Sequence, residues 1–281
     1  MLQSSFLFLL FILPSLALLI PTRSGSDPDP RCQPIKTTFD KPSSLSHIND
    51  PDPFTSPFIC LGSRDSCKLS PEGGLELHLL PPEGPVTRKG NLNDVVSDGA
   101  TVNSTFSFNY GKVIFEIQAA TVPGTVTAPI LYDAISMNSG DTIQGDELDW
   151  ELLGAHPKTC QTNMFSPKPQ DSSPHYGMFN GKHRLPSGSG SIANVHSYSI
   201  ARDADKIVWS VDGVDVRVQR REDSEVDGVL LWPRHEMKIS LGAWDASYAV
   251  GTSNWAGGPI IWEDVKEPIK AVVKSVSLEC W

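Results

Sequence analysis

Many short runs of alternating apolar and polar residues, without any sustained helical period, constrain the fold more than any other feature of this sequence. Gly, Asn, Asp and Pro residues separate the runs, and Asp212-Gly213 supplies the positive backbone angles of a tight hairpin turn. The pattern predicts one all-β domain, an antiparallel β-sandwich of jelly-roll type without internal repeats. The main expected strands cover residues 75–79, 104–108, 112–117, 128–132, 196–200, 206–211, 214–218, 237–241 and 271–278.

The amino-terminal part of the chain divides into two segments. Residues 6–20 are almost entirely apolar and give way to a polar run, which predicts a signal peptide over residues 1–24; an uncleaved anchor is the alternative. Residues 25–57 are rich in Pro, Asp and Ser, and we expect an extended N-terminal arm that Cys32 can pin. Residues 58–281 are left for the β-sandwich.

The rest of the sequence has no apolar run of membrane-spanning length and no hydrophobic tail of the kind a glycosylphosphatidylinositol anchor needs. We therefore expect no membrane span after signal removal, and a protein secreted to the extracellular space or cell wall. In that oxidising compartment up to two disulfides can form, with one thiol left over. The sequence leaves the pairing open among Cys32, Cys60, Cys67, Cys160 and Cys280.

The formal net charge is −10, with acidic residues scattered and basic residues unclustered. Nucleic acids and anionic lipids both select clustered Lys and Arg, so this distribution argues against either partner. A neutral polymer such as a polysaccharide fits at least as well, and we expect a monomer. No Cys-x-x-Cys or His-x-x-x-His spacing supports a metal site, so neither a metal nor another cofactor is predicted.

One short stretch concentrates acidic residues. Alternation along a strand places Glu147, Asp149 and Glu151 on one face, while the apolar residues between and after them point to the other. Flanking glycines favour a strand over a helix, although a helix would also bring the two glutamates together. Three like charges on one face are a poor structural choice, so the cluster indicates chemistry. A solvated acidic strand or a calcium-binding patch is the alternative.

Paired carboxyl groups are the machinery of a retaining glycosidase, in which one attacks the anomeric carbon and the other protonates the leaving oxygen. The two groups must lie roughly 5 to 5.5 Å apart. The Cα atoms of Glu147 and Glu151 are roughly 13 Å apart on an extended strand, so both side chains must lean toward Asp149. Asp149 can then hydrogen-bond one glutamate and divide the pair into acid and nucleophile.

The segment from Asp146 to Gly154 resembles the signature of glycoside hydrolase family sixteen. Its Glu-x-Asp-x-Glu spacing, followed by the run from Gln161 to Phe165, resembles the fungal cell-wall Crh transglycosylases that join chitin to β-glucan. The likeness covers roughly residues 70 to 280, and it continues in residues 110–113, 196–200, 241–244 and 251–258.

This resemblance implies a concanavalin-A-like sandwich with a concave substrate cleft. It implies that Glu147 is the nucleophile, Asp149 the assisting residue, and Glu151 the general acid and base, which also binds substrate. It further implies that Trp244 stacks against a sugar ring and that Thr252 binds substrate. The sequence departs from the family pattern in its loops at residues 133–144 and 155–159. Ser240 stands where the family tends to have a basic residue, with Lys238 nearby, and Arg202 replaces the usual tryptophan.

Several polar residues have both a functional and a structural interpretation. Gln161 and Asn163 lie two apart on one strand face and can hydrogen-bond sugar hydroxyls. Asn103 begins an Asn-x-Ser/Thr glycosylation sequon, with an unmodified strand edge as the alternative. His196 is interpreted as a hydrogen-bonded structural residue, because a retaining carboxylate pair needs no histidine.

Four further tryptophans can line a sugar cleft, and we expect about two of them in the core instead. Trp209 shares a strand face with Ile207 and Val211, which favours the core, whereas Trp255 follows Thr252 closely and is left open between core and cleft. The remaining two are Trp232 and Trp262.

Together these features predict a retaining enzyme that cleaves chitin or β-glucan and transfers it to β-glucan acceptors. A plain endo-β-glucanase or chitinase of the same fold is one alternative. A lectin-like protein that binds polysaccharide without turnover is another, although a binding module has no need of three adjacent carboxylates. Transfer competes with hydrolysis according to how well the acceptor side binds sugar and excludes water.

Overall fold

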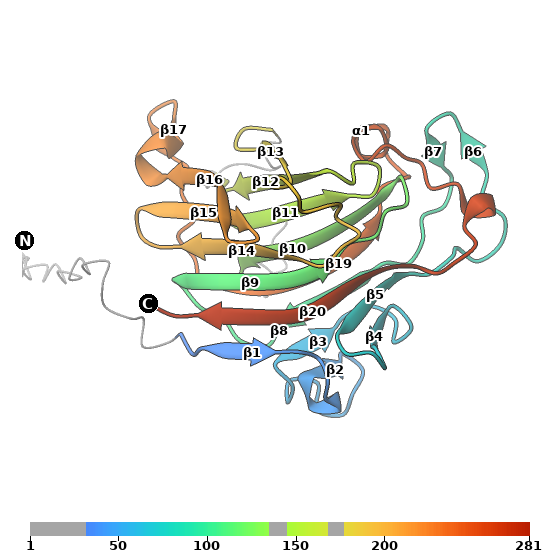
Figure 1. Ribbon diagram of the computed structural model, residues 1–281, viewed down its shortest axis with the longest axis horizontal. Helices are drawn as coiled ribbons and strands as arrows, with labels where there is room; N and C mark the ends of the chain where they lie inside the picture. Colours follow the sequence, from blue (N-terminus) through green and yellow to red (C-terminus); the bar gives the residue numbers. More distant parts are fainter. Residues whose placement is uncertain (1–31, 135–144, 168–176) are drawn as a thin grey trace, which may run out of the picture.

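Two sheets of eight strands each form the body of the computed structural model (Figure 1). The structure describes residues 32–134, 145–167 and 177–281. The predicted signal peptide lies outside these ranges, as do residues 135–144 of the loop that precedes the acidic stretch. Nearly all strand pairs are antiparallel, so the predicted antiparallel β-sandwich is confirmed.

The sheet that holds the acidic stretch is called the β11 sheet. Its strands, in spatial order, are β13 (Gly181–Arg184), β12 (Thr159–Phe165), β11 (Glu147–Leu153), β10 (Thr125–Asp133), β19 (Met237–Asp245), β8 (Ala100–Ser104), β3 (Phe58–Cys60) and β2 (Leu45–His47). The β2–β3 pair is parallel.

The opposite sheet is called the β9 sheet. Its strands, in spatial order, are β16 (Val214–Arg220), β15 (Lys206–Val211), β14 (His196–Arg202), β9 (Gly111–Gln118), β20 (Ile269–Glu279), β5 (Leu75–Leu79) and β4 (Cys67–Leu69), and β1 (Ile35–Thr37) also pairs with β20.

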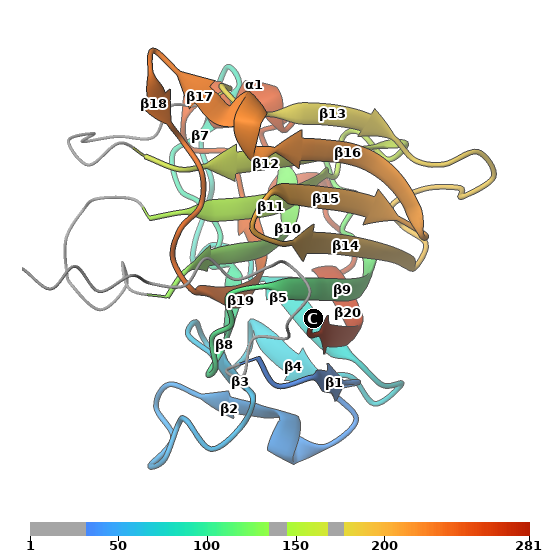
Figure 2. The same cartoon turned by 90° about the vertical axis from the view of Figure 1, so that its left-hand side faces the viewer.

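Short elements cover the ends of the sandwich (Figure 2). They are the ribbons β6 (Arg88–Lys89) with β7 (Leu92–Asn93) and β17 (Glu225–Val226) with β18 (Val229–Leu230), the helix α1 (Val250–Trp255), and the 3₁₀ turns η1 (Pro42–Ser44), η2 (Arg221–Ser224) and η3 (Trp262–Asp264). None of the helices in the described ranges is long and apolar enough to cross a membrane.

The core lies between the sheets and follows from strand alternation. Leu148, Trp150 and Leu152 of β11 point into it, and Trp209 of β15 meets them from the other side. All four are fully buried, which removes large apolar surfaces from water. The predicted hairpin turn joins β15 to β16, with positive φ at Asp212 and Gly213 (51° and 78°).

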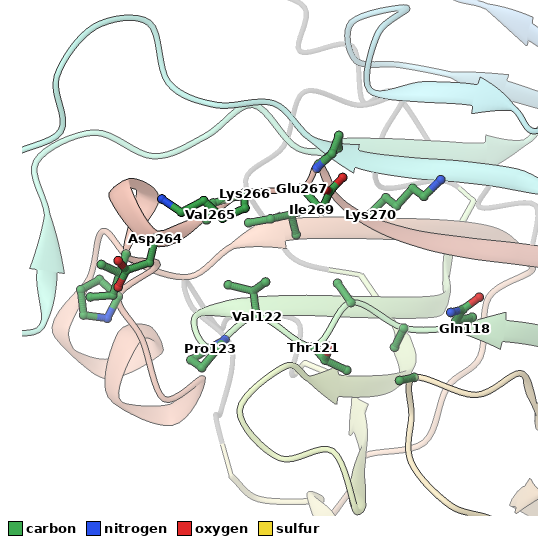
Figure 3. Close-up of a pocket in the computed structure, with 16 residues that line it drawn as sticks. Gln118, Thr121, Val122, Pro123, Asp264, Val265, Lys266, Glu267, Ile269 and Lys270 are labelled. Atoms are coloured by element: carbon green, nitrogen blue, oxygen red, sulfur yellow. The ribbon is translucent and has the colours of Figure 1, made fainter.

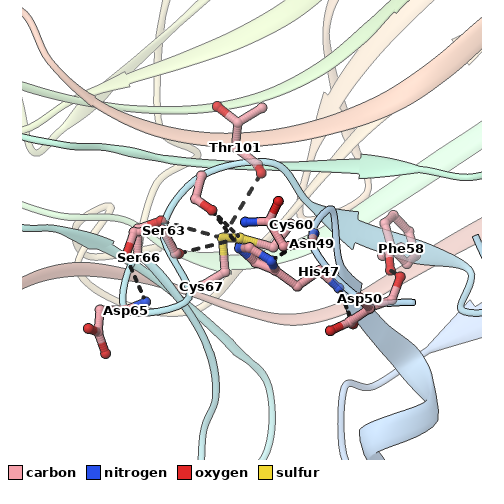
Figure 4. Close-up of a disulfide and its surroundings, with 12 residues drawn as sticks. His47, Asn49, Asp50, Phe58, Cys60, Ser63, Asp65, Ser66, Cys67 and Thr101 are labelled. Atoms are coloured by element: carbon pink, nitrogen blue, oxygen red, sulfur yellow. Dashed lines mark hydrogen bonds between the residues drawn. A yellow bond between two sulfur atoms is a disulfide. The ribbon is translucent and has the colours of Figure 1, made fainter. Parts of the chain in front are cut away.

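The cysteines form two disulfides and leave one thiol, as the count predicted. Cys32 pairs with Cys280 across a sequence separation of 248, while Cys60 pairs with Cys67 across 7 (Figure 4). Cys160 is free and buried.

The predicted N-terminal arm contributes to the sandwich over its described part. Residues 32–57 supply β1, which pairs with β20, and β2, which pairs with β3. His47 of β2 contacts the carbonyl oxygen of Gly62 through its Nε2 atom at 2.7 Å (Figure 4). The boundary at residue 57 between arm and domain stays a prediction.

Candidate active site

The acidic stretch forms β11, and its carboxyl groups occupy the outer face of the β11 sheet because the intervening residues fill the core. Glu147 and Glu151 are partly exposed, whereas Asp149 between them is only 2% exposed. The structure thus places the three predicted residues on one face, as alternation requires, with the aspartate enclosed and the glutamates partly exposed.

The neighbouring strands place polar and aromatic side chains beside this row. On β12, Asn163 is the register partner of Asp149, and Gln161 is the partner of Glu151. On β10, Tyr132 is the partner of Glu147. Sequence reasoning proposed Gln161 and Asn163 but missed Tyr132, because the register between two strands joined by a loop cannot be read from alternation alone.

Burial and mutual repulsion change the proton affinity of the three carboxyls. Burial raises the pKa of Asp149 well above its ordinary value, and the charges of Glu151 and Glu147 raise it further. Burial also raises the pKa of Glu147, while a hydrogen bond from Asp149 opposes that increase. The hydrogen bond therefore favours a protonated Asp149 that donates to an ionised Glu147.

Glu151 has a different environment from Glu147. Burial, and then the charge of Glu147, raises the pKa of Glu151 to about 7. Burial and the Glu147 charge both favour its protonated form, so this carboxyl keeps its proton in mildly acidic solution. One face thus offers a carboxylate that accepts a hydrogen bond and a separate carboxylic acid, the two protonation states that glycosidic cleavage needs.

A tryptophan pair lies at the Glu151 end of this face. Trp244 of β19 and Trp255 of α1 are stacked, with ring centroids 6.0 Å apart and planes inclined by 23°. Trp255 donates its Nε1–H to Oε1 of Gln161 at 3.1 Å. Gln161 faces Glu151 across the strands, so this hydrogen bond ties the aromatic pair to the acidic row.

The other two predicted binding residues are held by local hydrogen bonds. The Oδ1 atom of Asn163 accepts the backbone N–H of Met164 at 2.9 Å, and the asparagine is buried. The hydroxyl of Thr252 is directed at the carbonyl oxygens of Ala246 and Ala249 at 3.2 and 3.1 Å. Thr252 itself is exposed on α1, on the same helix as Trp255.

A model of the Glycosyl hydrolases family 16 matches residues 56–263 of the chain. The chain belongs to this family. The Probable glycosidase CRR1 of Saccharomyces cerevisiae is 33% identical over 177 residues, which cover 61% of this chain and 38% of that protein. Crh-like protein 5 of Aspergillus fumigatus is 27% identical over 252 residues, 89% of this chain and 56% of the relative.

Solved structures share the fold of this family 16 chain. A Crh5 transglycosylase in complex with NAG superposes with a TM-score of 0.63 at 23% identity, covering 91% of this chain and 88% of that chain. The laminarinase catalytic domain from Thermotoga maritima has a TM-score of 0.63 at 17% identity, with 88% and 97% covered. The chain spans only 38% of the length of CRR1 and 40% of that of Crh-like protein 2 of Aspergillus fumigatus.

Asn103 does not occupy the exposed position that glycosylation needs. It lies on β8 inside the β11 sheet, between Ser240 of β19 and Ile59 of β3, and is 4% exposed. Its side chain is hydrogen-bonded to Tyr132. The strand edge expected as the alternative is wrong, because β8 has a partner on each side. This placement argues against a glycan on Asn103 in the folded family 16 domain.

The remaining tryptophans and His196 have structural surroundings. Trp209 and Trp232 are buried in the core, and Trp262 packs against a smaller apolar cluster. His196 contacts Oδ2 of Asp212 and the carbonyl oxygen of Ser191, each at 2.9 Å. These placements agree with two tryptophans in the core and a structural histidine.

Arg202, where a tryptophan was expected, is buried and donates to the carbonyl oxygens of His235 and Pro233 at 2.9 and 2.8 Å. It also lies over the Tyr110 ring, with its Cζ atom 5.5 Å from the ring centroid. A planar cation here satisfies backbone acceptors that an indole could not all reach.

A hollow away from the acidic row lies at one end of the sandwich, between residues 118–123 and 259–270 (Figure 3). Among the described residues, those that line this hollow include no aromatic ring. Its acidic residues Asp264 and Glu267 alternate along the chain with Lys266 and Lys270. It offers no stacking surface for a sugar. Within the described ranges, no group of three or more His, Cys, Asp or Glu side chains is arranged to hold a metal ion.

Proposed function

We propose that this chain is a retaining transglycosylase that cleaves chitin or β-glucan and transfers the released chain to a β-glucan acceptor. One observation carries the proposal: a single strand presents Asp149 hydrogen-bonded to Glu147, with Glu151 kept protonated up to about pH 7. In this assignment Glu147 is the nucleophile, Asp149 the assisting residue and Glu151 the acid and base.

The first step breaks the glycosidic bond. The carboxylate of Glu147 attacks the anomeric carbon while the carboxylic acid of Glu151 gives its proton to the departing oxygen, leaving a glycosyl ester on Glu147. As Glu147 loses its charge, the proton that Asp149 shares with it can return fully to the aspartate. Loss of the Glu147 charge also removes one cause of the raised pKa of Glu151, which then favours the ionised base.

The second step resolves the ester. Ionised Glu151 takes a proton from an acceptor hydroxyl, and that oxygen attacks the anomeric carbon and releases Glu147. Trp244 and Trp255 supply a flat apolar surface at the Glu151 end, where a pyranose C–H face can stack. Gln161 and Asn163 add amide groups on the same face, and Thr252 is proposed as a further contact beyond it.

The relatives support the proposed substrate and location. The names of the relatives include Crh-like proteins and a Crh5 transglycosylase, and one Crh5 structure holds NAG, which supports a cell-wall polysaccharide with amino-sugar units. Two disulfides fit an oxidising compartment. We infer secretion to the cell wall after removal of the signal peptide, and action as a monomer.

The deciding experiment offers fluorescent chito- and gluco-oligosaccharides together with chitin, and follows hybrid products and free reducing ends. Hybrid formation is expected in the wild type and is lost in Glu147→Gln. Glu225→Gln, an exposed glutamate on β17, is the matched control and should keep full activity. Shortened oligosaccharides alone would reduce the assignment to a hydrolase, and binding without any product would refute both enzymatic assignments.

A further inference from the structure

Two side chains of the β9 sheet pack against the rear of the acidic row. Trp209 of β15 is fully buried and donates its Nε1–H to the backbone carbonyl oxygen of Asp149 at 3.1 Å. The two residues are 60 apart in sequence and lie on opposite sheets. This hydrogen bond therefore fixes the peptide group of Asp149 relative to the other half of the sandwich.

Arg217 of β16 lies over the ring face of the same indole. Its Cζ atom is 4.5 Å from the centroid of the Trp209 ring. Its Nη1 atom donates to Oγ1 of Thr162 at 3.0 Å and to the Thr162 carbonyl oxygen at 3.3 Å. His183 of β13 contacts the same Oγ1 at 2.9 Å. The stacked pair thus holds β11 through Trp209 and β12 through Arg217.

Arg217 also brings a positive charge close to the acidic row. Its charge lowers the pKa of Asp149, against the larger opposing effects of burial, Glu151 and Glu147 on the same strand. The register partner of Asp149 on each adjacent strand, Ile130 on β10 and Asn163 on β12, does not titrate. Burial lowers the pKa of Arg217 to about 10, so it remains a cation at neutral pH.

We propose that Trp209 and Arg217 are positioning residues that set the place of the Asp149 peptide, and through it the spacing of Glu147 and Glu151, from behind the sheet. The proposal rests on the proposed function, because spacing matters only if the two glutamates share one reaction. Carboxyl pairs of this kind tolerate little displacement, and a shift of about 1 Å can cost about 100-fold in rate.

The first test compares two matched substitutions. Trp209→Phe removes the N–H to Asp149 and keeps an aromatic ring beneath Arg217. Phe58→Leu trims a fully buried core ring on β3, four strands away from β11 in the same sheet, and so disturbs the core without touching the acidic row. We expect similar losses of melting temperature, but a fall in kcat of about 10-fold or more at unchanged KM in Trp209→Phe only. Equal losses of kcat in both variants would overturn the proposal.

The second test does not need Trp209→Phe to fold and does not depend on activity. In protein with ¹³C-labelled aspartate carboxyls, Arg217→Gln should raise the titration midpoint of Asp149 by roughly half a unit, because a nearby cation is lost. Arg217→Lys keeps the charge and should restore the wild-type midpoint. An Asp149 midpoint unmoved by Arg217→Gln overturns the inference. A wild type without turnover would refute the proposed function, while this titration would still decide whether Arg217 lies beside Asp149 as the inference requires.

Discussion

Asp149 is 2% exposed, and its Oδ1 oxygen has no hydrogen-bond partner within the part of the chain that the structure describes. A buried acceptor without a partner costs about 1 to 3 kcal/mol. A protonated Asp149 lowers this cost, because the remaining oxygen then carries no full charge. The same enclosure that costs stability keeps a proton next to Glu147.

Asp149→Asn should stabilise the protein in alkaline solution. Burial raises the folded pKa of Asp149 above its unfolded value, so above about pH 4 the folded state binds a proton that the unfolded chain has released, and stability falls as pH rises. Asparagine is neutral and can still donate to Glu147. We expect its melting temperature to exceed the wild-type value by a few degrees at pH 8, at roughly 2 to 4 °C per kcal/mol, and to match it near pH 4. A constant difference at all pH values would contradict this explanation.

Glu151 should set the alkaline limit of catalysis. Its pKa is raised to about 7, so the proton needed by the leaving oxygen is lost above that pH, and kcat/KM for oligosaccharides should fall there. Glu151→Gln should lose roughly 100- to 10,000-fold of activity. An aryl glycoside with an acidic phenol needs no such proton and is the control substrate. If its rate fell equally above pH 7, Glu151 would not be the acid.

At the scale of elements, α1 joins the site through one hydrogen bond and one ring stack. Trp255 is the only residue of α1 that both stacks on Trp244 and donates to β12, among the contacts that the described residues make. A six-residue helix thereby fixes one wall of the proposed sugar-binding surface.

Substitutions of Trp255 should separate these two contacts. Trp255→Phe keeps the stack and loses the N–H that holds Gln161 in place, so part of the binding surface must be ordered when substrate binds. KM for oligosaccharides should therefore rise about 2- to 10-fold, with kcat nearly unchanged. Trp255→Ala loses both contacts and should raise KM further. Steady-state kinetics check both values, and Trp262→Phe, remote from the acidic row, serves as the control. If Trp255→Ala kept the wild-type KM, α1 would not be part of the binding surface.

Sequence reasoning succeeded where one strand carries its own pattern and failed where partners are distant. Alternation in β11 was sufficient to place Glu147, Asp149 and Glu151 on one face. It could not show that Trp209, correctly predicted as core, bonds the Asp149 peptide, because that contact depends on how two sheets pack. The burial of Asn103 could not be foreseen for a related reason: a sequon carries no information about whether its strand lies inside a sheet or at an edge.

At the scale of the whole molecule, the Cys32–Cys280 disulfide encloses both sheets within one covalent loop. The bond lies beside the β1–β20 pair, which it holds together at the edge of the β9 sheet. Closing so long a loop restricts the unfolded chain more than closing the short Cys60–Cys67 loop.

Removing each disulfide in turn should reveal this difference. The Cys32→Ser/Cys280→Ser variant is expected to lose about 2 to 5 kcal/mol of unfolding free energy. Cys60→Ser/Cys67→Ser removes a disulfide that closes a much shorter loop, so it should lose less unfolding free energy. Urea denaturation of both variants under identical non-reducing conditions gives the comparison. The opposite order would show that local packing around Cys60, rather than loop length, governs the stabilisation.

The covalent loop also has a mechanical consequence. A pull on the segments that flank Cys32 and Cys280 is carried by the sulfur–sulfur bond and does not reach the strands between them. Tension would therefore not separate β1 from β20 until that bond was reduced. The spacing of the acidic row would stay unchanged until then as well. A sandwich closed in this way resists unfolding under tension at edges that hydrogen bonds alone would not hold.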